Sequence, residues 1–162
     1  MFEHDVRVSK QMLNLLRALV KEIDDANFLR PVPGARNPPA FILSHLAVTA
    51  DAGLMRLGRE KLCPDSWHQA FRPGSKPEEV PFAYPSKQEL TAVVERGYEA
   101  LQSAALSATP EQVNQPHGVA FLKGSPMESV GDLIVLLLTS HMGIHLGQLS
   151  LMRRQLGFPP LF

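Results

Sequence analysis

The sequence predicts an all-α fold, a four-helix bundle with a long proline-rich loop between its second and third helices. Three observations lead to this prediction. Apolar residues recur at the three- and four-residue spacing of a helix in four long stretches. Helix-capping and helix-breaking residues separate these stretches. No stretch alternates apolar and polar residues as a half-buried strand would, so packing of amphipathic helices is the expected architecture.

The first helix is expected within residues 5–30. Its apolar positions share one helical face: Val8, Met12, Leu15, Leu16, Leu19, Val20 and Ile23. The helix should end before the segment RPVPGARNPP, because its prolines and glycine do not continue a helix. Asn37 followed by Pro38 is typical of an N-cap with proline at the first helical position. A second helix is therefore expected from about residue 38 to about Gly58.

The proline-rich loop covers residues 59–85, with the sequence REKLCPDSWHQAFRPGSKPEEVPFAYP. It holds five prolines and shows no sustained periodicity. A loop of this length in a compact domain is more often a functional lid or a packed cover than idle chain. Trp67 and Phe71 are expected to anchor it to the bundle, and His68 is the loop histidine that could fold over a site. Cys63 is expected to be a bystander.

The third helix is predicted by the sequence SKQE at residues 86–89. This is a capping box, in which the Ser86 hydroxyl and the Glu89 carboxylate each accept from a free backbone N–H at a helix start. Apolar residues then continue along one face as far as Ala104. The helix should stop near Ser107, ahead of Pro110.

The fourth helix has two candidate starts. SPME at residues 125–128 is a capping box with proline at its first position, SVGD at residues 129–132 offers a second possible start, and the choice between them stays open. From either start a long helix should run to Gly157, a suitable residue just beyond a helix end. The following pair of prolines prevents continuation.

Length and composition limit the classes of function. The 162 residues predict one domain spanning 1–162, and 16 basic residues balance 16 acidic ones. No run of like charge exceeds two residues, so we expect no nucleic-acid and no membrane partner. The single cysteine excludes an internal disulfide and a paired-cysteine metal cluster, which fits a cytoplasmic protein. The N-terminus does not resemble a signal peptide, and the longest apolar run, residues 133–138, is too short to span a bilayer.

Two histidines stand out within the apolar segment LIVLLLTSHMGIHLGQL. His141 and His145 are four residues apart, so their rings leave the same face of the fourth helix. That face is expected to point inward, and by the same spacing it also carries Ile134, Leu137 or Leu138, Gln148 and Met152. Buried imidazoles need partners, and a divalent metal satisfies both acceptor nitrogens at once. The alternative is a pair of core or interface histidines satisfied by neighbouring side chains.

The second helix offers a third ligand, His45, on the face that carries Phe41 and Ile42. A lone histidine there would usually be a satisfied core residue, but three inward histidines favour a metal site. Such a set leaves a coordination position open for water or substrate, as in catalytic zinc sites. Thr49 and Gln148 are the candidates to orient a ligand or to contact a bound molecule. A core hydrogen-bonding amide is an equal alternative for Gln148.

Other polar residues are assigned no catalytic role. Asp51 lies about 120° from the His45 direction on its helix, so it is a poor fourth ligand and is expected to be solvated or cap-related. Arg153 and Arg154 are expected to be solvated at the helix end. The remaining histidines are expected on the surface, at a chain end or in loops: His4, His68 and His117. The identity of the metal stays open, because histidine ligands suit zinc, nickel, copper and iron.

The segments that carry these histidines resemble a known family. The segments VGDLIVLLLTSHMGIHLGQLSLMRRQLG and NPPAFILSHLAV resemble the DinB-like (DinB/YfiT) superfamily of metal-binding four-helix bundles. The pieces AFRPGSKP and AYPSKQEL resemble one subgroup of it. The resemblance implies that His45, His141 and His145 are the metal ligands, that the metal is zinc or nickel, and that the protein forms a homodimer.

The resemblance also implies two classes of function. Family members of known activity include thiol-dependent transferases, which use mycothiol, bacillithiol or glutathione, and a maleylpyruvate isomerase. The first hypothesis is therefore an enzyme that activates a low-molecular-weight thiol or water at the open metal position, acting as a thiol S-transferase or a hydrolase. The alternative is a non-enzymatic, stress-related module that binds a metal or another small ligand. A metal-free helical dimer with polar core histidines is the third.

Overall fold

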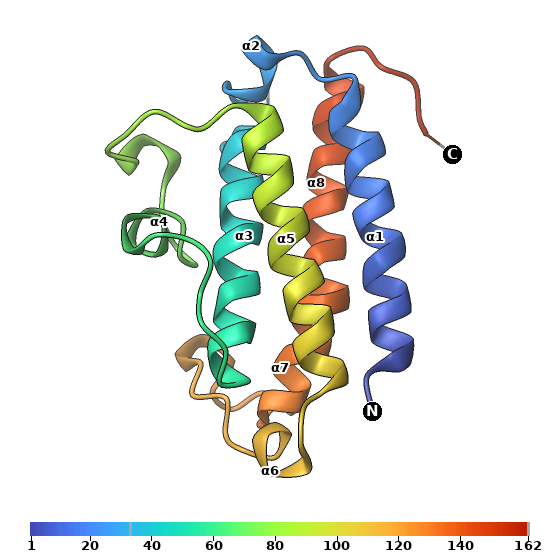
Figure 1. Ribbon diagram of the computed structural model, residues 1–162. Coiled ribbons are helices and arrows are strands. Elements are labelled where there is room, and N and C mark those ends of the chain that lie inside the picture. The colour runs from blue at the N-terminus through green and yellow to red at the C-terminus, as the bar shows by residue number, and fades with distance from the viewer. Residues whose placement is uncertain (33, 162) are drawn as a thin grey trace.

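The computed structural model describes residues 1–32 and 34–161. Its long helical elements are α1 (Glu3–Lys21), α3 (Pro39–Arg56), α5 (Lys87–Leu106) and a final run made of α7 (Val130–Leu136), the π-helical turn η3 (Leu137–His141) and α8 (Met142–Gln155). Figure 1 shows these elements lying side by side along one direction. The described residues contain no strand, only an isolated bridge between Pro116 and Ser129. The predicted all-α fold is confirmed.

Short helical turns lie in the connections between these elements. They are α2 (Asp25–Phe28), α4 (Asp65–Ala70), η1 (Pro77–Glu79), α6 (Pro110–Val113) and η2 (Ala120–Leu122). In Figure 1, α4 lies on the outer side of α3, and α6 lies at the lower end of the bundle beside α7. Contacts between α6 and α7 and between α4 and α3 agree with this arrangement.

The first helix is shorter than the sequence predicts. It ends at Lys21, and the Asp24 side chain then accepts a hydrogen bond of 2.8 Å from the backbone N–H of Asn27. This N-cap begins the separate turn α2. The prediction of one helix within residues 5–30 is therefore wrong beyond Lys21, because apolar periodicity continues through Ile23 while the backbone restarts at Asp24.

The second helix begins one residue later than predicted. Pro38 is the N-cap and Pro39 occupies the first helical position, so Asn37 does not cap the helix. The predicted end is close to the observed one, since α3 ends at Arg56 and Gly58 adopts a φ of 71°. The left-handed conformation at Gly58 turns the chain into the proline-rich loop.

Both later helices use capping boxes. The Ser86 hydroxyl accepts from the Glu89 N–H while the Glu89 carboxylate accepts from the Ser86 N–H, as predicted. For the fourth helix the structure selects Ser129, which exchanges the same pair of bonds with Asp132. The final run ends at Gln155, two residues before Gly157 with its φ of 91°.

Glycines let α3 and α5 pack closely. A Cβ atom on Gly97 would lie 3.3 Å from the Cβ of Ala50, and one on Gly53 would lie 2.7 Å from a methyl carbon of Leu101. A Cβ at Gly53 would force the buried Leu101 side chain to shift, and one at Gly97 would force the two helices apart by a few tenths of an ångström. This close packing holds the backbone of α3, which carries His45, against the rest of the core.

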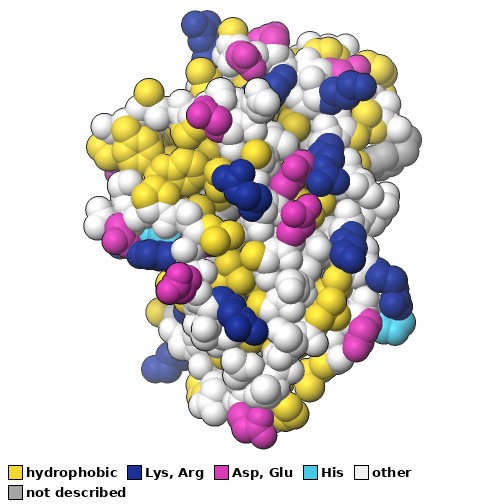
Figure 2. All heavy atoms as spheres, viewed as in Figure 1, with side chains coloured by type: hydrophobic (Ala, Val, Ile, Leu, Met, Phe, Trp, Pro, Cys, Tyr) yellow, Lys and Arg dark blue, Asp and Glu magenta, His cyan; other side chains and the backbone are white. Residues whose placement is uncertain are grey.

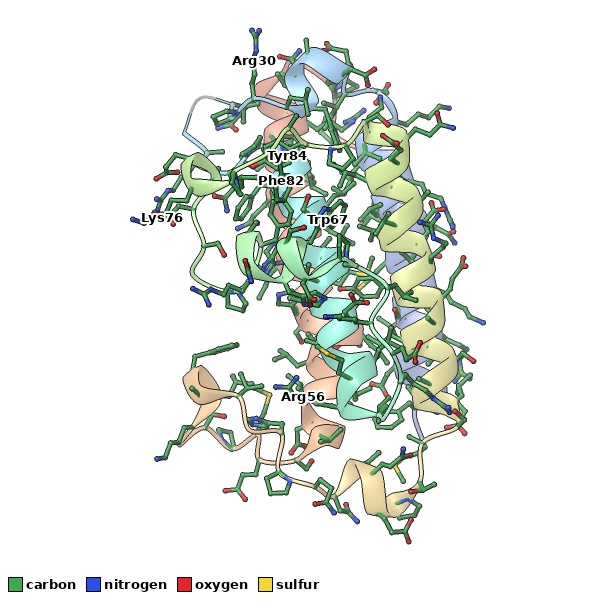
Figure 3. All side chains as sticks on the ribbon, turned by 60° about the vertical axis from the view of Figure 1, so that its left-hand side comes forward. Arg30, Arg56, Trp67, Lys76, Phe82 and Tyr84 are labelled. Atoms are coloured by element: carbon green, nitrogen blue, oxygen red, sulfur yellow. The ribbon has the colours of Figure 1, made fainter. Side chains whose placement is uncertain are left out.

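The proline-rich loop packs on α3 through aromatic rings. Phe71 is completely buried and meets Phe41 of α3 edge-on at 5.6 Å between ring centroids. Trp67, Phe82 and Tyr84 each place a ring within 6 Å of Phe71, and Figure 3 shows them gathered beside α3. Figure 2 shows a hydrophobic patch over the segment that leads into α5. The loop is a packed cover anchored by Trp67 and Phe71, as predicted.

The final helical run is unusually apolar. Val130–Gln155 spans 26 residues, and its most apolar 18-residue window has a mean hydropathy of 1.4. By length and composition alone this is enough to cross a membrane, although 39% of that window is buried inside the structure. Core helices of bundles share this composition, and this run contacts α1 and α3. Three of its large apolar side chains are nevertheless exposed: Val135, Ile144 and Leu151.

Candidate metal centre

Three histidine rings from two distant parts of the chain meet inside the bundle. The Nε2 atom of His141 lies 3.3 Å from the Nε2 of His45 and 3.3 Å from the Nε2 of His145. One ligand atom from each residue lies within 4.8 Å of the others. His45 comes from the middle of α3, His141 ends η3 and His145 lies in the first turn of α8. The structure thus brings the sequence-predicted set together.

The hydrogen bonds of two rings fix which nitrogen carries the proton. His45 Nδ1 lies 2.6 Å from the carbonyl oxygen of Phe71, and His145 Nδ1 lies 2.9 Å from Oε1 of Gln148. Both oxygens only accept hydrogen bonds, so each Nδ1 donates. A neutral imidazole carries one proton, so the Nε2 atoms of His45 and His145 present free lone pairs to the centre of the cluster.

The donor set fits a tetrahedral divalent metal. Bonds of about 2.0–2.1 Å at a tetrahedral angle separate two ligand nitrogens by about 3.3–3.4 Å, which matches both contacts of His141. Lone pairs at this spacing repel one another unless a proton or a cation lies between them. His141 Nδ1 is also buried and has no hydrogen-bond partner among the described residues. A cation shared by the three Nε2 atoms relieves the repulsion at the centre.

The electrostatics of the cluster keep the rings neutral. Burial, together with the neighbouring His145 and His45, lowers the pKa of His141 to about 3. Burial and the charge of His45 lower the pKa of His145 to about 4, against the opposing bond to Gln148. Burial also lowers the pKa of His45, against the opposing bond to the Phe71 carbonyl. Neutral imidazole is the form that binds a metal, so these rings need no deprotonation at neutral pH.

A π-helical turn delivers His141 to the cluster. Residues Leu137–His141 form this turn, whereas the sequence predicts one uninterrupted helix. The Thr139 hydroxyl donates to the carbonyl of Val135 at 2.6 Å. Bonds from threonine back to the carbonyl four residues earlier often bend helices. One extra residue in a turn rotates the preceding helix by about 100° relative to the following one. Such turns are frequent at functional sites, and here α7 and α8 can both bury apolar faces while the histidines face α3.

An apolar cavity adjoins the cluster. Its volume is about 350 Å³, and His141 forms part of its wall. Apolar side chains make up most of the lining: Val48, Ala52, Val119, Phe121, Leu133 and Leu136. The polar side chains of the lining are Thr49, Arg56, His68 and Arg72. This volume lies within the range of small-molecule sites, so the cluster borders a space large enough for a substrate.

A second cavity borders the other two histidines. It measures about 270 Å³ and is lined by His45 and His145. Arg72 and Pro73 line both cavities, so the short segment after Phe71 separates them. The same segment supplies the carbonyl that orients His45. The proline-rich loop therefore both covers and positions the histidine cluster.

The two predicted accessory residues take different places. Gln148 is exposed and accepts the hydrogen bond of His145, so it orients a ring rather than lying in the core. Thr49 is buried on the cavity wall, where its hydroxyl donates to the carbonyl of Leu46 at 3.0 Å. Gln148 therefore serves the cluster, and Thr49 contributes to the surface of the cavity.

Asp51 and His68 form a pair that the sequence reasoning missed. The expectation of a solvated Asp51 is wrong, because its side chain is completely buried and accepts from the N–H groups of Leu62 and Cys63. It also lies 3.0 Å from His68 Nε2, while His68 Nδ1 has no partner among the described residues. The ring of His68 lines the cavity. An acidic residue on the otherwise apolar face of a helix was the available signal for this pair.

The only cysteine does not contribute a nucleophile. Cys63 is buried, and burial, followed by the charge of Asp51, raises the pKa of its thiol to about 12. The thiolate is therefore scarcely populated at neutral pH. The expectation that Cys63 is a bystander agrees with this environment.

Two other expectations about polar side chains are wrong. His117 is buried rather than on the surface, since its Nε2 donates to the Met127 carbonyl and its Nδ1 accepts from the Val119 N–H. Arg153 is buried rather than solvated, since its Nε donates to Glu22 at 3.0 Å. Both residues hold segments together. His4 and Arg154 are exposed, as expected.

Comparison with known families agrees with this architecture. The family model described as the DinB superfamily matches residues 10–149. The chain belongs to the DinB superfamily. The matched range includes all three histidines of the cluster, and family membership and geometry together fit the binding of a divalent metal. No curated protein matches the sequence of this DinB-superfamily chain.

Proposed function

We propose that this DinB-superfamily protein is a metal-dependent enzyme in which His45, His141 and His145 hold a divalent cation, zinc or nickel. One observation carries the proposal: His141 Nε2 lies at tetrahedral ligand spacing from the Nε2 atoms of both His45 and His145, and His141 also forms part of the wall of the apolar cavity. Three protein ligands leave a coordination position for a thiol or water. The metal, when bound, lowers the pKa of such a ligand and so supplies a nucleophile at neutral pH.

The residues around the ligands keep the rings in place. The Phe71 carbonyl and the Gln148 amide each hold one Nδ1–H, which directs the opposite nitrogen of His45 and His145 toward the cation. Because the Phe71 carbonyl lies in the proline-rich loop, folding of that loop and orientation of His45 are coupled.

His68 is the proposed proton acceptor. Asp51 accepts the Nε2–H of His68, so the neutral ring carries its free lone pair on Nδ1. The ring lines the same cavity as His141, within the space that a substrate would occupy. A histidine held by a buried carboxylate is a suitable group to take the proton of a reacting thiol or water.

A low-molecular-weight thiol is the favoured cosubstrate over a protein thiol. Cys63 is buried and remains protonated, so a reacting sulfur has to come from outside the chain. The cavity at His141 favours an enzyme over a non-enzymatic metal module, because a purely structural metal needs no adjacent space for a ligand. A thiol at the open coordination position would give thiol S-transfer, and a water there would give hydrolysis.

Cobalt substitution tests the proposal. Cobalt-loaded protein should develop a sulfur-to-metal charge-transfer band when glutathione, cysteine or mercaptoethanol is added. The His141→Ala variant should show no such band, and the exposed His4→Ala variant should behave as the unmodified protein does. A fully loaded protein whose spectrum no thiol changes would exclude thiol activation.

We also propose that the protein is a homodimer and that it acts in the cytoplasm. A homodimer is supported by the exposed apolar side chains of the final helical run, Val135, Ile144 and Leu151, which a second copy would cover. A single cysteine, kept as a thiol, suits the cytoplasm. The family match over residues 10–149 supports one domain across residues 1–162. The cavity beside His141 supports a small molecule as the partner.

A further inference from the structure

We propose that the cavity beside His141 binds a carboxylate with an apolar body, and that the charged end of this ligand pairs with Arg56. The inference rests on the proposed function in one respect, namely that the far end of the ligand reaches the histidine cluster. It goes further by naming the chemical class of the substrate and the residue that selects it.

Arg56 is a half-buried cation without an anionic partner. Its Nε donates to the carbonyl of His117 at 2.8 Å and its Nη1 donates to the carbonyl of Ala52 at 3.0 Å. Its Nη2 has no hydrogen-bond partner among the described residues, and none of their carboxylates pairs with it. Burial alone lowers the pKa of Arg56, with no contribution from an acidic neighbour. Two carbonyls thus fix the guanidinium while one edge stays available.

Arg56 and Arg153 are the two arginines of the described residues that are not exposed to solvent. Arg153 pairs with the carboxylate of Glu22, whereas Arg56 pairs with none. The other arginines that lack a carboxylate partner are exposed, so water can solvate their charge. A partly desolvated guanidinium without a counter-charge is unfavourable, and its planar fork matches a carboxylate. A ligand carboxylate would supply the missing charge at Arg56.

The rest of the cavity indicates the chemistry of the ligand. No acidic side chain lines it, while a second arginine, Arg72, does. Figure 3 shows Arg56 beside an open space, with the α4 segment above that space and the connection between α6 and α7 below it. The remaining walls are mainly apolar. A net positive, apolar cavity favours an anion that carries a hydrocarbon or aromatic body over a sugar or a cation.

Helix geometry sets the length of this ligand. Arg56 follows His45 by eleven residues on α3, which corresponds to a rise of about 16 Å along the helix. Helical side chains lean toward the N-terminus, so the arginine stem covers part of this distance. A ligand that reaches from Arg56 toward the cluster is therefore an extended molecule rather than acetate or another very small anion.

Calorimetry with a matched pair of probes tests the proposal. We would titrate 4-phenylbutanoate and its neutral analogue 4-phenylbutanamide into metal-loaded protein and into chelator-treated protein, because a carboxylate can also bind the metal directly. In both preparations the acid should bind at least about tenfold more tightly than the amide. The preference should disappear in Arg56→Gln, persist in part in Arg56→Lys and remain unchanged in Arg59→Gln, whose arginine is exposed and contacts Ser107.

Three results would overturn the proposal: equal affinity for acid and amide, no binding of the acid at millimolar concentration, or a preference that persists in Arg56→Gln. Circular dichroism checks that Arg56→Gln folds, since it loses the bond to His117. If it does not fold, Arg56→Lys and the comparison of acid with amide in the unmodified protein decide. Acid preference in a protein that never binds metal would leave the anion site standing and refute the metal function. Metal binding without a preference for the acid would refute the anion site and leave the metal function standing.

Discussion

Acid should destabilise the metal-free protein over a pH range set by His141 and His145. In the folded chain their pKa values are lowered to about 3 and about 4, below the ordinary histidine value of 6.5. A histidine whose folded pKa is lowered contributes stability that is complete above pH 6.5 and is lost as the pH falls toward the folded value. The free energy of unfolding should therefore decrease below pH 6.5.

The size of this loss follows from the same pKa values. Between pH 6.5 and its folded pKa, each histidine lowers the free energy of unfolding of the protein by about 1.4 kcal/mol per pH unit. From about pH 7.5 to about pH 5.5, His141 and His145 together would lose about 3 kcal/mol if fully shielded, and partial exposure reduces this to between about 1 and 3 kcal/mol. The lowered pKa of His45 acts in the same direction. Such a loss is a measurable part of a typical domain stability of about 5–15 kcal/mol.

Urea unfolding of chelator-treated protein at the two pH values measures the effect. The unmodified protein and the exposed control His4→Gln should both lose stability on acidification. The double variant His141→Gln, His145→Gln should lose much less, because its buried side chains do not titrate. Equal stability at both pH values, or the same loss in the double variant, would refute the assignment of the two rings as buried and neutral.

Three further predictions concern metal affinity, packing and assembly. Gln148→Leu should weaken metal affinity about 10- to 100-fold in a chelator competition, whereas the exposed Gln155→Leu should not, because Gln148 orients the ring of His145 and Gln155 contacts no ligand ring. Gly53→Ala should lower the urea midpoint, because overpacking costs about 1–3 kcal/mol of stability and the gain in helix propensity is about 1 kcal/mol. Gly147→Ala should raise the midpoint, because a Cβ there would meet no atom within 4 Å. Ile144→Asp should convert a dimer to a monomer in sedimentation velocity, and an unchanged dimer would place the interface elsewhere.

Local patterns account for the part of the site that the sequence predicts. The spacing of four between His141 and His145 brings their rings together on one helix, and the apolar face around His45 turns that ring toward the core. Ser86 caps its helix through bonds within four residues, so its prediction needs no knowledge of the rest of the fold. Contacts of this kind depend on few neighbouring residues.

The missed features depend on packing between distant segments. His68 meets Asp51 only because the proline-rich loop folds back on α3. The π-helical turn is surrounded by α1, α3 and α5, and no single-helix pattern specifies it. Arg56 is held in place by the carbonyl of His117, which lies on the far side of α5 in the sequence. Each of these requires the tertiary structure.

Metal analysis of untagged protein tests the central claim most directly. Protein purified without chelator should carry a stoichiometric divalent metal, and His45→Ala, His141→Ala and His145→Ala should each lose most of it. His68→Ala should keep the metal, because His68 lines the cavity and belongs to the Asp51 pair rather than to the cluster. Protein that carries no divalent metal after supplementation with zinc or nickel, or triad variants that retain it fully, would contradict the account.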